Sequence, residues 1–376
     1  MKIVFDKLLK PARDRLTNML PGFGRDLSIG MDMGPDRLNL VQMELVAGRP
    51  AIRAIASLPY PCPREELELH PQKLKSLLKQ AYAMQPFKGR RVVSCLPASQ
   101  IKIITLTYKE GQPDAVAIVA ELRERLQGEL DNLVVDFMIL REQEANPGHR
   151  DALVAMAPRN KVLAYLDLLT GAGLEVEALD VGPAALARLV SQEGALHTPE
   201  FPLQPNALLI NFGADSSHLT VIWGRRLMLD RAVEFCENKV FSRLKQLLDM
   251  PQDLAVRLLY EKKSALNGPD GASRMLGEVL RPEIAMLLQE VNKTLVYMAS
   301  RTHGKSVDVI YLAGRLALYP DVLNAFRDQM KIPVRMLNPV ELFASERSRL
   351  NDKGLGEITG IALSAGLALR GVPENE

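Results

Sequence analysis

The chain has 376 residues, 47% of them hydrophobic and 24% charged, and its 47 Lys and Arg nearly balance its 45 Asp and Glu. This composition predicts one large core or two ordinary ones and excludes a disordered chain. The near balance excludes a global field that would draw the protein to nucleic acid or to an anionic bilayer. The cysteines Cys62, Cys95 and Cys236 lack the close spacing of a metal site, which indicates thiols in a reducing compartment. With no apolar run near the ~18 to 20 residues that span a bilayer, and no signal peptide, we expect a cytoplasmic protein.

Residues 1–26 form a basic N-terminal leader in which apolar residues mix with Lys and Arg. An amphipathic helix on a membrane surface is one interpretation. A partly ordered leader packed on the protein is the other, and Pro11 argues against a continuous helix. We therefore expect the ordered fold to begin at Leu27.

The first candidate loop lies between two apolar strands in residues 27–44. Gly34 in the turn lets backbone N–H groups approach an anion, and Asp32 at the strand end can orient a hydrated Mg²⁺. Taken alone, Asp-x-Gly after a strand is typical of many ordinary hairpins. The loop is therefore evidence for phosphate binding only if the sequence contains a second copy.

Residues 207–224 supply that second copy: a strand enters Asn211-Phe212-Gly213, and Ser216 and Ser217 add hydroxyl donors near the turn. Paired loops predict a duplicated lobe. A third element, the buried strand over residues 307–314, ends at Gly314 and is followed by Arg315, with a helix expected from about Pro320. A glycine turn of this kind lets a flat base lie against the backbone.

Two phosphate loops followed by an adenosine turn, in this order, resemble the actin-like nucleotide-binding superfamily. The strands at 91–97, 101–107, 134–140 and 151–158, with a helix from Asp114 to Leu130, form a strand-helix-strand-strand module. It stands where the cell-division protein FtsA and the type IV pilus assembly protein PilM carry theirs. The helix ending in Ala172-Gly173-Leu174 and the final helix, Ala362 to Arg370, are similar to PilM sequences, and the chain ends without the amphipathic tail of FtsA. The resemblance therefore favours the PilM family, from about Leu27 to Arg370.

This resemblance implies an α/β, actin-like (ribonuclease H-like) two-lobed fold with an inserted strand-helix-strand-strand subdomain. After the leader, we expect a first lobe over 27–203 with the insertion at about 89–175, and a second lobe over 204–352. Within the second lobe, a helical subdomain at about 237–304 should contain helices from Glu237 to Glu261 and from Leu276 to Ser300. Residues 353–376 should return to the first lobe as a C-terminal helix.

The family also implies a function: a cytoplasmic component of the inner-membrane platform of a type IV pilus or related secretion machine. PilM proteins bind ATP and grip the cytoplasmic N-terminal tail of the membrane protein PilN beside the inserted module. We therefore expect a PilN-like partner and other platform proteins, with self-association left open and no nucleic acid. Such a chain would be peripheral on the inner face of the bacterial inner membrane, recruited by its partner.

The resemblance implies a set of candidate residues for binding ATP and Mg²⁺. Each of them lies at one of the three turns. They are Asp32 (also the metal candidate), Gly34, Asp36, Arg37, Asn39, Asn211, Gly213, Ser216, Ser217, Gly314 and Arg315.

Three of these residues depart from the family pattern. Asn39 stands where the first loop has a Lys, and Asn211 where the second has an Asp. Each lost charge weakens nucleotide binding by roughly tenfold or more, since a hydrogen bond to a charged group contributes about 1.5 to 3 kcal/mol. Arg315 replaces the second Gly of the adenosine turn, where it either obstructs the base, stacks on it or reaches a phosphate. Arg37 is a candidate to restore the missing positive charge.

Hydrolysis needs more than binding, and the second loop offers no matching carboxylate. Asp215 is better explained as a turn cap and His218 as a packed side chain. Glu237-Asn238-Lys239 and Glu261-Lys262-Lys263 stand where base and ribose contacts often fall, and solvated helix faces explain them equally well. We interpret the chain as a degenerate ATP-binding scaffold with no assigned catalytic residue. The alternatives are an active ATPase that remodels the platform and a sugar-kinase-like enzyme of the same superfold.

Overall fold

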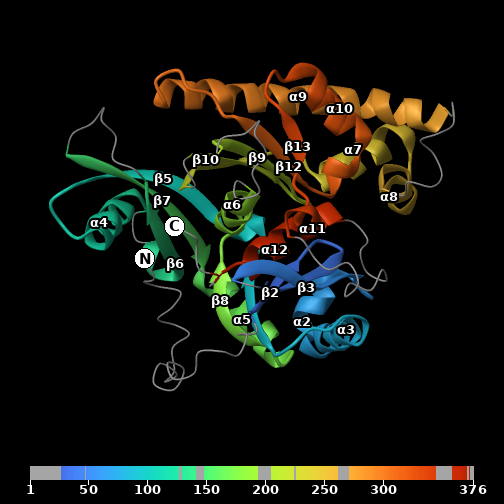
Figure 1. The fold of residues 1–376 in the computed structure, drawn as a ribbon, viewed down its shortest axis with the longest axis horizontal. Helices are drawn as coiled ribbons and strands as arrows, with labels where there is room; N and C mark the ends of the chain where they lie inside the picture. The colour runs from blue at the N-terminus through green and yellow to red at the C-terminus, as the bar shows by residue number, and fades with distance from the viewer. Residues whose placement is uncertain are drawn as a thin grey trace. The chain divides into compact units, whose positions relative to one another are not determined.

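The computed structural model describes residues 27–46, 48–126, 129–140, 148–193, 205–223, 226–260, 271–343, 358–370 and 372. The chain divides into two compact units (Figure 1). Unit 1 comprises Met1–Leu189, Pro339–Gly356 and Leu363–Glu376, and unit 2 comprises Val190–Asn338 and Glu357–Ala362. The N-terminal leader, residues 353–357 and the Glu261-Lys262-Lys263 segment lie outside the described residues.

Unit 1 is built on a five-stranded sheet in the order β3-β2-β1-β4-β8. Its strands are β1 (Ile29–Met33), β2 (Arg37–Val46), β3 (Arg49–Pro59), β4 (Arg91–Cys95) and β8 (Glu175–Asp180). The first three pair antiparallel, whereas β4 and β8 continue the sheet in parallel. A parallel part covered on both faces needs apolar residues on both sides of each strand, which is the pattern of β4.

Helices cover both faces of this sheet. They are α2 (Arg64–Leu69), α3 (Pro71–Met84), α5 (Arg159–Gly171), α6 (Gly182–Glu193) and α12 (Ala362–Ala368). Val92 of β4 faces the core shared with α3 and α5, while Val93 packs with Ala185 of α6 and Leu367 of α12. The C-terminal helix therefore packs within unit 1.

The inserted module is confirmed as strand-helix-strand-strand, but it begins at β5, because the predicted strand at 91–97 is β4 of the five-stranded sheet. Its antiparallel sheet has the order β5-β7-β6, with β5 (Lys102–Lys109), β6 (Leu133–Ile139) and β7 (His149–Pro158). Helix α4 (Asp114–Leu126) buries Ile118 and Leu122 on one face of this sheet. The helix ends at Leu126 rather than at Leu130, and the short 3₁₀ helix η2 (Glu129–Asn132) leads into β6.

Unit 2 repeats the strand order and directions of unit 1, as expected for a duplicated lobe. Its sheet runs β11-β10-β9-β12-β13, with two antiparallel pairings followed by two parallel ones. The strands are β9 (Ala207–Phe212), β10 (Ser217–Trp223), β11 (Arg226–Val233), β12 (Val309–Gly314) and β13 (Val334–Met336). Its core gathers buried side chains of the sheet with those of the helices that cover it.

The helical part of unit 2 corrects one prediction, because the expected helix from Glu237 to Glu261 is two helices. They are α7 (Glu237–Leu248) and α8 (Gln252–Tyr260). Asp249 ends α7 in the left-handed conformation with φ 48°, and Pro251 has no N–H to continue the helix. The remaining helices are α9 (Gly271–Arg301), longer than predicted, η3 (Arg315–Leu318), α10 (Pro320–Gln329), α11 (Pro339–Leu342, in unit 1) and η4 (Ile358–Ile361).

Candidate functional site

The first predicted loop is held by a chain of polar side chains across three strands. Asp32 of β1 lies opposite Asn39 of β2, which lies opposite Ser57 of β3. The Asn39 Nδ2 donates to Asp32 Oδ2 at 3.3 Å, and its Oδ1 accepts from the Ser57 hydroxyl at 2.7 Å. Arg37 Nη1 reaches Ser57 Oγ at 3.4 Å, and its Nε lies 4.0 Å from Asp36. Asn39 therefore orients Asp32 and supplies no charge.

A positive charge at this loop comes from Arg64, which the sequence analysis missed. Its Nη1 donates to the Gly34 carbonyl at 3.1 Å, and the Tyr60 hydroxyl donates to the same carbonyl at 3.0 Å. Glu68 fixes the same guanidinium through a 2.8 Å ion pair. No local motif could have found Arg64, because α2 returns to the loop only after β2 and β3 have crossed the sheet.

The Asp32 side chain is half-buried. Burial raises its pKa above the ordinary value of 3.8, and the hydrogen bond from Asn39 and the charge of Arg64 offset only part of this effect. Among the described residues, no group of three His, Cys, Asp or Glu side chains is placed to hold a metal ion. The metal role of Asp32 therefore stays a prediction.

We expect Asp32→Asn to stabilise the protein at neutral pH. The folded state binds the Asp32 proton more tightly than the unfolded chain, so stability falls as pH rises from about 3.8 through the raised pKa. The amide removes this cost, and the second sheet already carries Asn211 at the matching place. The melting temperature should rise by about 2 to 4 °C at pH 8 and by less near pH 4.5, measured by thermal scanning. Asp36→Asn, at a half-exposed carboxylate in the same loop, is the control. A lower melting temperature for Asp32→Asn at both pH values would contradict the prediction.

The second loop has the same register as the first, since Asn211 of β9 lies opposite His218 of β10. His218 thus occupies the place that Asn39 has in unit 1. Its Nδ1 lies 2.8 Å from Asp230 Oδ2, and Thr220 donates to the other oxygen of Asp230 at 2.6 Å. Its Nε2 lies 3.5 Å from the Ser216 hydroxyl. His218 is thus packed and oriented, as the sequence suggested.

Two backbone carbonyls of the second loop are hydrogen-bonded to helix α7. The carbonyls of Gly213 and Ala214 accept from the first N–H groups of α7 at 3.1 and 3.0 Å. A Cβ at Gly213 would lie 2.3 Å from the Ser216 carbonyl oxygen, so this tight turn needs glycine. The buried Ser217 hydroxyl donates to the Phe235 carbonyl, which corrects its predicted role as a phosphate donor. Asp215 accepts from the Asn238 side chain of α7 at 2.8 Å, and its role as a turn cap stays a prediction.

The third turn brings β12 against β9. Gly314 has φ 88°, and a Cβ there would lie 2.1 Å from the Phe212 carbonyl oxygen, so only glycine fits. The next residue, Arg315, is buried, and its guanidinium lies over the ring of Tyr260 beside Glu237. The residues present therefore do not fit a bound adenosine on unit 2, because a side chain of the protein fills the space against this turn.

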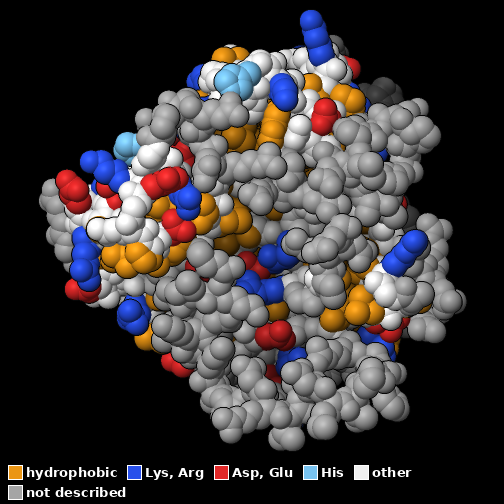
Figure 2. Space-filling model, turned by 60° about the vertical axis from the view of Figure 1, so that its left-hand side comes forward, with side chains coloured by type: hydrophobic (Ala, Val, Ile, Leu, Met, Phe, Trp, Pro, Cys, Tyr) orange, Lys and Arg blue, Asp and Glu red, His pale blue; other side chains and the backbone are white. Residues whose placement is uncertain are grey.

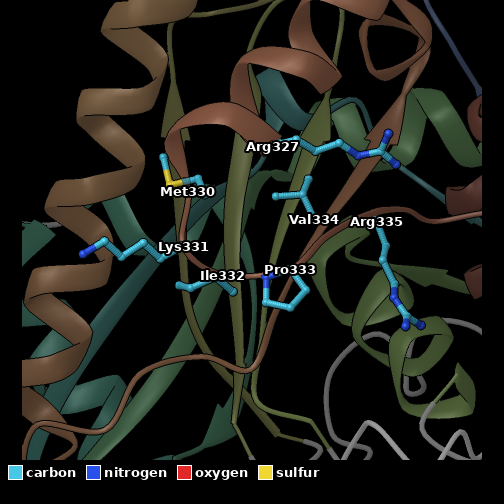
Figure 3. A pocket seen from close by; sticks show the side chains of 7 residues that line it. All are labelled: Arg327, Met330, Lys331, Ile332, Pro333, Val334 and Arg335. Atoms are coloured by element: carbon cyan, nitrogen blue, oxygen red, sulfur yellow. The ribbon is translucent and has the colours of Figure 1, made fainter.

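A hollow of about 470 Å³ also opens at the edge strand β13. Its basic side chains are Arg327, Lys331 and Arg335, and Figure 3 shows Lys331 pointing away from the other two. Because these charges do not converge, the hollow has no common point for an anion.

The comparisons with known proteins agree with this geometry. The duplicated sheets with paired loops define an actin-like ATPase fold. The chain is 23% identical to a chain of a PilM–PilN type IV pilus biogenesis complex, covering 93% of this chain and 100% of that one with a TM-score of 0.74. The ethanolamine utilization protein EutJ from Carboxydothermus hydrogenoformans is 14% identical over 94% of this chain and 92% of its own, with a TM-score of 0.52.

A family model described as type IV pilus assembly protein PilM matches residues 30–372. The chain belongs to this family. None of the described helices is long and apolar enough to cross a membrane.

Proposed function

We propose that this chain is a cytoplasmic actin-like scaffold of the inner-membrane platform of a type IV pilus or related secretion machine. In this role it binds the cytoplasmic N-terminal tail of a PilN-like membrane protein, which holds it on the inner face of the membrane near other platform proteins. It binds ATP weakly and through the phosphates. Membership of the PilM family and the similarity to a chain of a PilM–PilN complex support the proposal.

The observation that carries the proposal is the face of the inserted module's sheet that α4 does not cover, part of which is half-buried rather than buried. Ile103 of β5, Ala155 of β7 and Asp136 of β6 lie side by side across its sheet, and all three are half-buried. The next residue along each strand belongs instead to the core under α4: Ile104, Val154 and Phe137. Because side chains alternate along a strand, the row of Ile103, Ala155 and Asp136 points away from α4.

Three features suit this face to an extended tail. Among the described strands, β5 and β6 each pair on one side only, which leaves main-chain groups for an added strand. The surface beside Ala155 is apolar and includes Leu179 and Val181, so an apolar side chain of the tail would meet apolar partners there. Asp136 provides a negative charge for a basic tail residue. Figure 2 turns the side of the molecule that carries this module toward the viewer and shows hydrophobic side chains open at the surface between charged ones.

The test is calorimetry with a synthetic peptide of the cytoplasmic N-terminus of a PilN-like protein. Ile103→Arg places a bulky charge in the row and should weaken binding at least about tenfold, the loss expected when an apolar contact becomes a desolvated charge. Val116→Arg, at an exposed position on α4, is the matched control and should leave affinity unchanged. If only the control loses affinity, the tail binds elsewhere; if wild type ignores the peptide, the proposed function is wrong.

The alternative function, an active ATPase of the platform, depends on Asp32 as the remaining metal-orienting carboxylate. Steady ATP hydrolysis that Asp32→Ala abolishes would favour it over a scaffold. We propose the scaffold because Asn39, Asn211 and Arg315 each remove a feature that nucleotide chemistry uses.

A further inference from the structure

The turn after β12 is closed by a side chain of the protein itself. Arg315 extends over α8, with its Cζ 4.3 Å from the centroid of the Tyr260 ring. Its Nη1 lies 3.8 Å from Glu237 Oε2, at the first residue of α7. The Arg315 and Glu237 side chains are 9% and 6% exposed. One guanidinium therefore joins η3, α7 and α8, all within unit 2.

The stem of Arg315 is also enclosed. A Cβ added at Gly360 in η4 would lie 3.8 Å from Arg315 Cγ, which is ordinary van der Waals contact. Arg315 is thus packed along its length, and its charge is compensated by Glu237 and by the face of Tyr260. A ligand that displaced the Arg315 side chain would therefore break these contacts.

A guanidinium and a nucleotide base make the same kind of contact with an aromatic ring: both are flat and both stack on its face. We infer that Arg315 takes the place of the base, so that any nucleotide is held by its phosphates with no preference for adenine. This inference rests on the weak nucleotide binding of the proposed function. It makes Arg315 a specificity-determining residue and leaves unit 2 folded without a nucleotide.

The experiment compares Mg-ATP with Mg-tripolyphosphate, which lacks the base, by calorimetry. The principal variant is Arg315→Gly with Glu237→Gln, because removing the arginine alone would leave a buried carboxylate without its neighbouring charge. The matched control is Arg243→Gln with Glu283→Gln, which removes another Arg–Glu pair of unit 2, a 2.9 Å ion pair between α7 and α9. Melting temperatures and circular dichroism establish that each variant folds.

In wild type and in the control variant, ATP and tripolyphosphate should bind with indistinguishable affinity. In the Arg315→Gly/Glu237→Gln variant, ATP should bind at least about tenfold more tightly than tripolyphosphate, the low end of what base–aromatic stacking contributes. The single variant Arg315→Gly gives a readout that needs no ligand. It should melt below the double variant, because it keeps the buried Glu237 carboxylate after the guanidinium beside it has been removed.

Two results would overturn the inference: a wild type that prefers ATP over tripolyphosphate tenfold, or a folded double variant that gains no preference for ATP. If wild type binds neither compound while the double variant binds ATP, Arg315 is confirmed as the obstacle. That result would contradict the weak phosphate binding in the proposed function, so the two failures are distinguishable.

Discussion

Replacing Gly30 by alanine is expected to destabilise unit 1 by at least about 3 kcal/mol, at the upper end of overpacking effects. A Cβ at Gly30 would lie 1.9 Å from the Ser364 carbonyl oxygen and 2.5 Å from the Ala368 backbone nitrogen. Both are backbone atoms of α12, so no side-chain rotation relieves the clash. The helix must move away from β1, and the buried contacts between them are lost.

The opposite side of α12 is equally close, which is why the helix cannot simply shift. A Cβ at Gly366 would lie 2.3 Å from the Ala185 carbonyl oxygen of α6. Gly182→Ala is the matched control, because its Cβ would meet only the Leu363 side chain of α12 at an ordinary 3.7 Å. Urea denaturation of the three proteins measures the effect. Equal midpoints for Gly30→Ala and wild type would mean that α12 does not pack against β1.

The sequence predicted those features that neighbouring residues encode. The two loops followed from a glycine turn between apolar strands, and the inserted module followed from its succession of strand and helix patterns. The break between α7 and α8 was missed, although Pro251 was a local signal for it, because apolar periodicity continues on both sides of the proline. Periodicity alone cannot separate one long helix from two that bury the same face.

The contacts that decide the chemistry are not local, and the sequence could not supply them. Arg64 and Tyr60 both contact the Gly34 carbonyl, because β3 brings the chain back beside the first loop just before these residues. Arg315 was singled out from sequence as a departure, with three outcomes left open. Choosing among them required Tyr260, which α8 brings to the turn from a distant part of the chain. Ser217 was assigned to phosphate because a hydroxyl near a turn suits it, whereas the fold directs that hydroxyl to Phe235.

Contacts between residues far apart in the sequence also hold the C-terminal helix α12 in unit 1. Asp180 ends β8, and its Oδ2 binds Arg188 of α6 and, at 3.1 Å, Arg370, which follows α12. Its Oδ1 accepts the Val181 N–H at 2.8 Å. The side chain is 5% exposed, so these partners compensate a buried charge. A β-strand end thus joins two helices that the sequence separates widely.

Asp180→Asn is expected to lower the free energy of unfolding by about 3 kcal/mol, because breaking a buried pair leaves its partners without compensation. Burial alone would raise the pKa of Asp180, but the charges of Arg188 and Arg370 and the Val181 N–H outweigh it and hold the pKa below 3.8. The stabilisation is therefore complete above pH 3.8 and is lost as pH falls through the lowered pKa. Denaturation at neutral pH and near pH 3 should show the two proteins converging in stability as acid is added. Asp253→Asn, at a 71% exposed carboxylate paired with Arg257 at 3.0 Å, is the control and should leave the denaturation midpoint unchanged, because solvent screens an exposed ion pair. An unchanged midpoint for Asp180→Asn as well would mean that Arg188 and Arg370 find other partners, and that α12 is held by its glycine contacts alone.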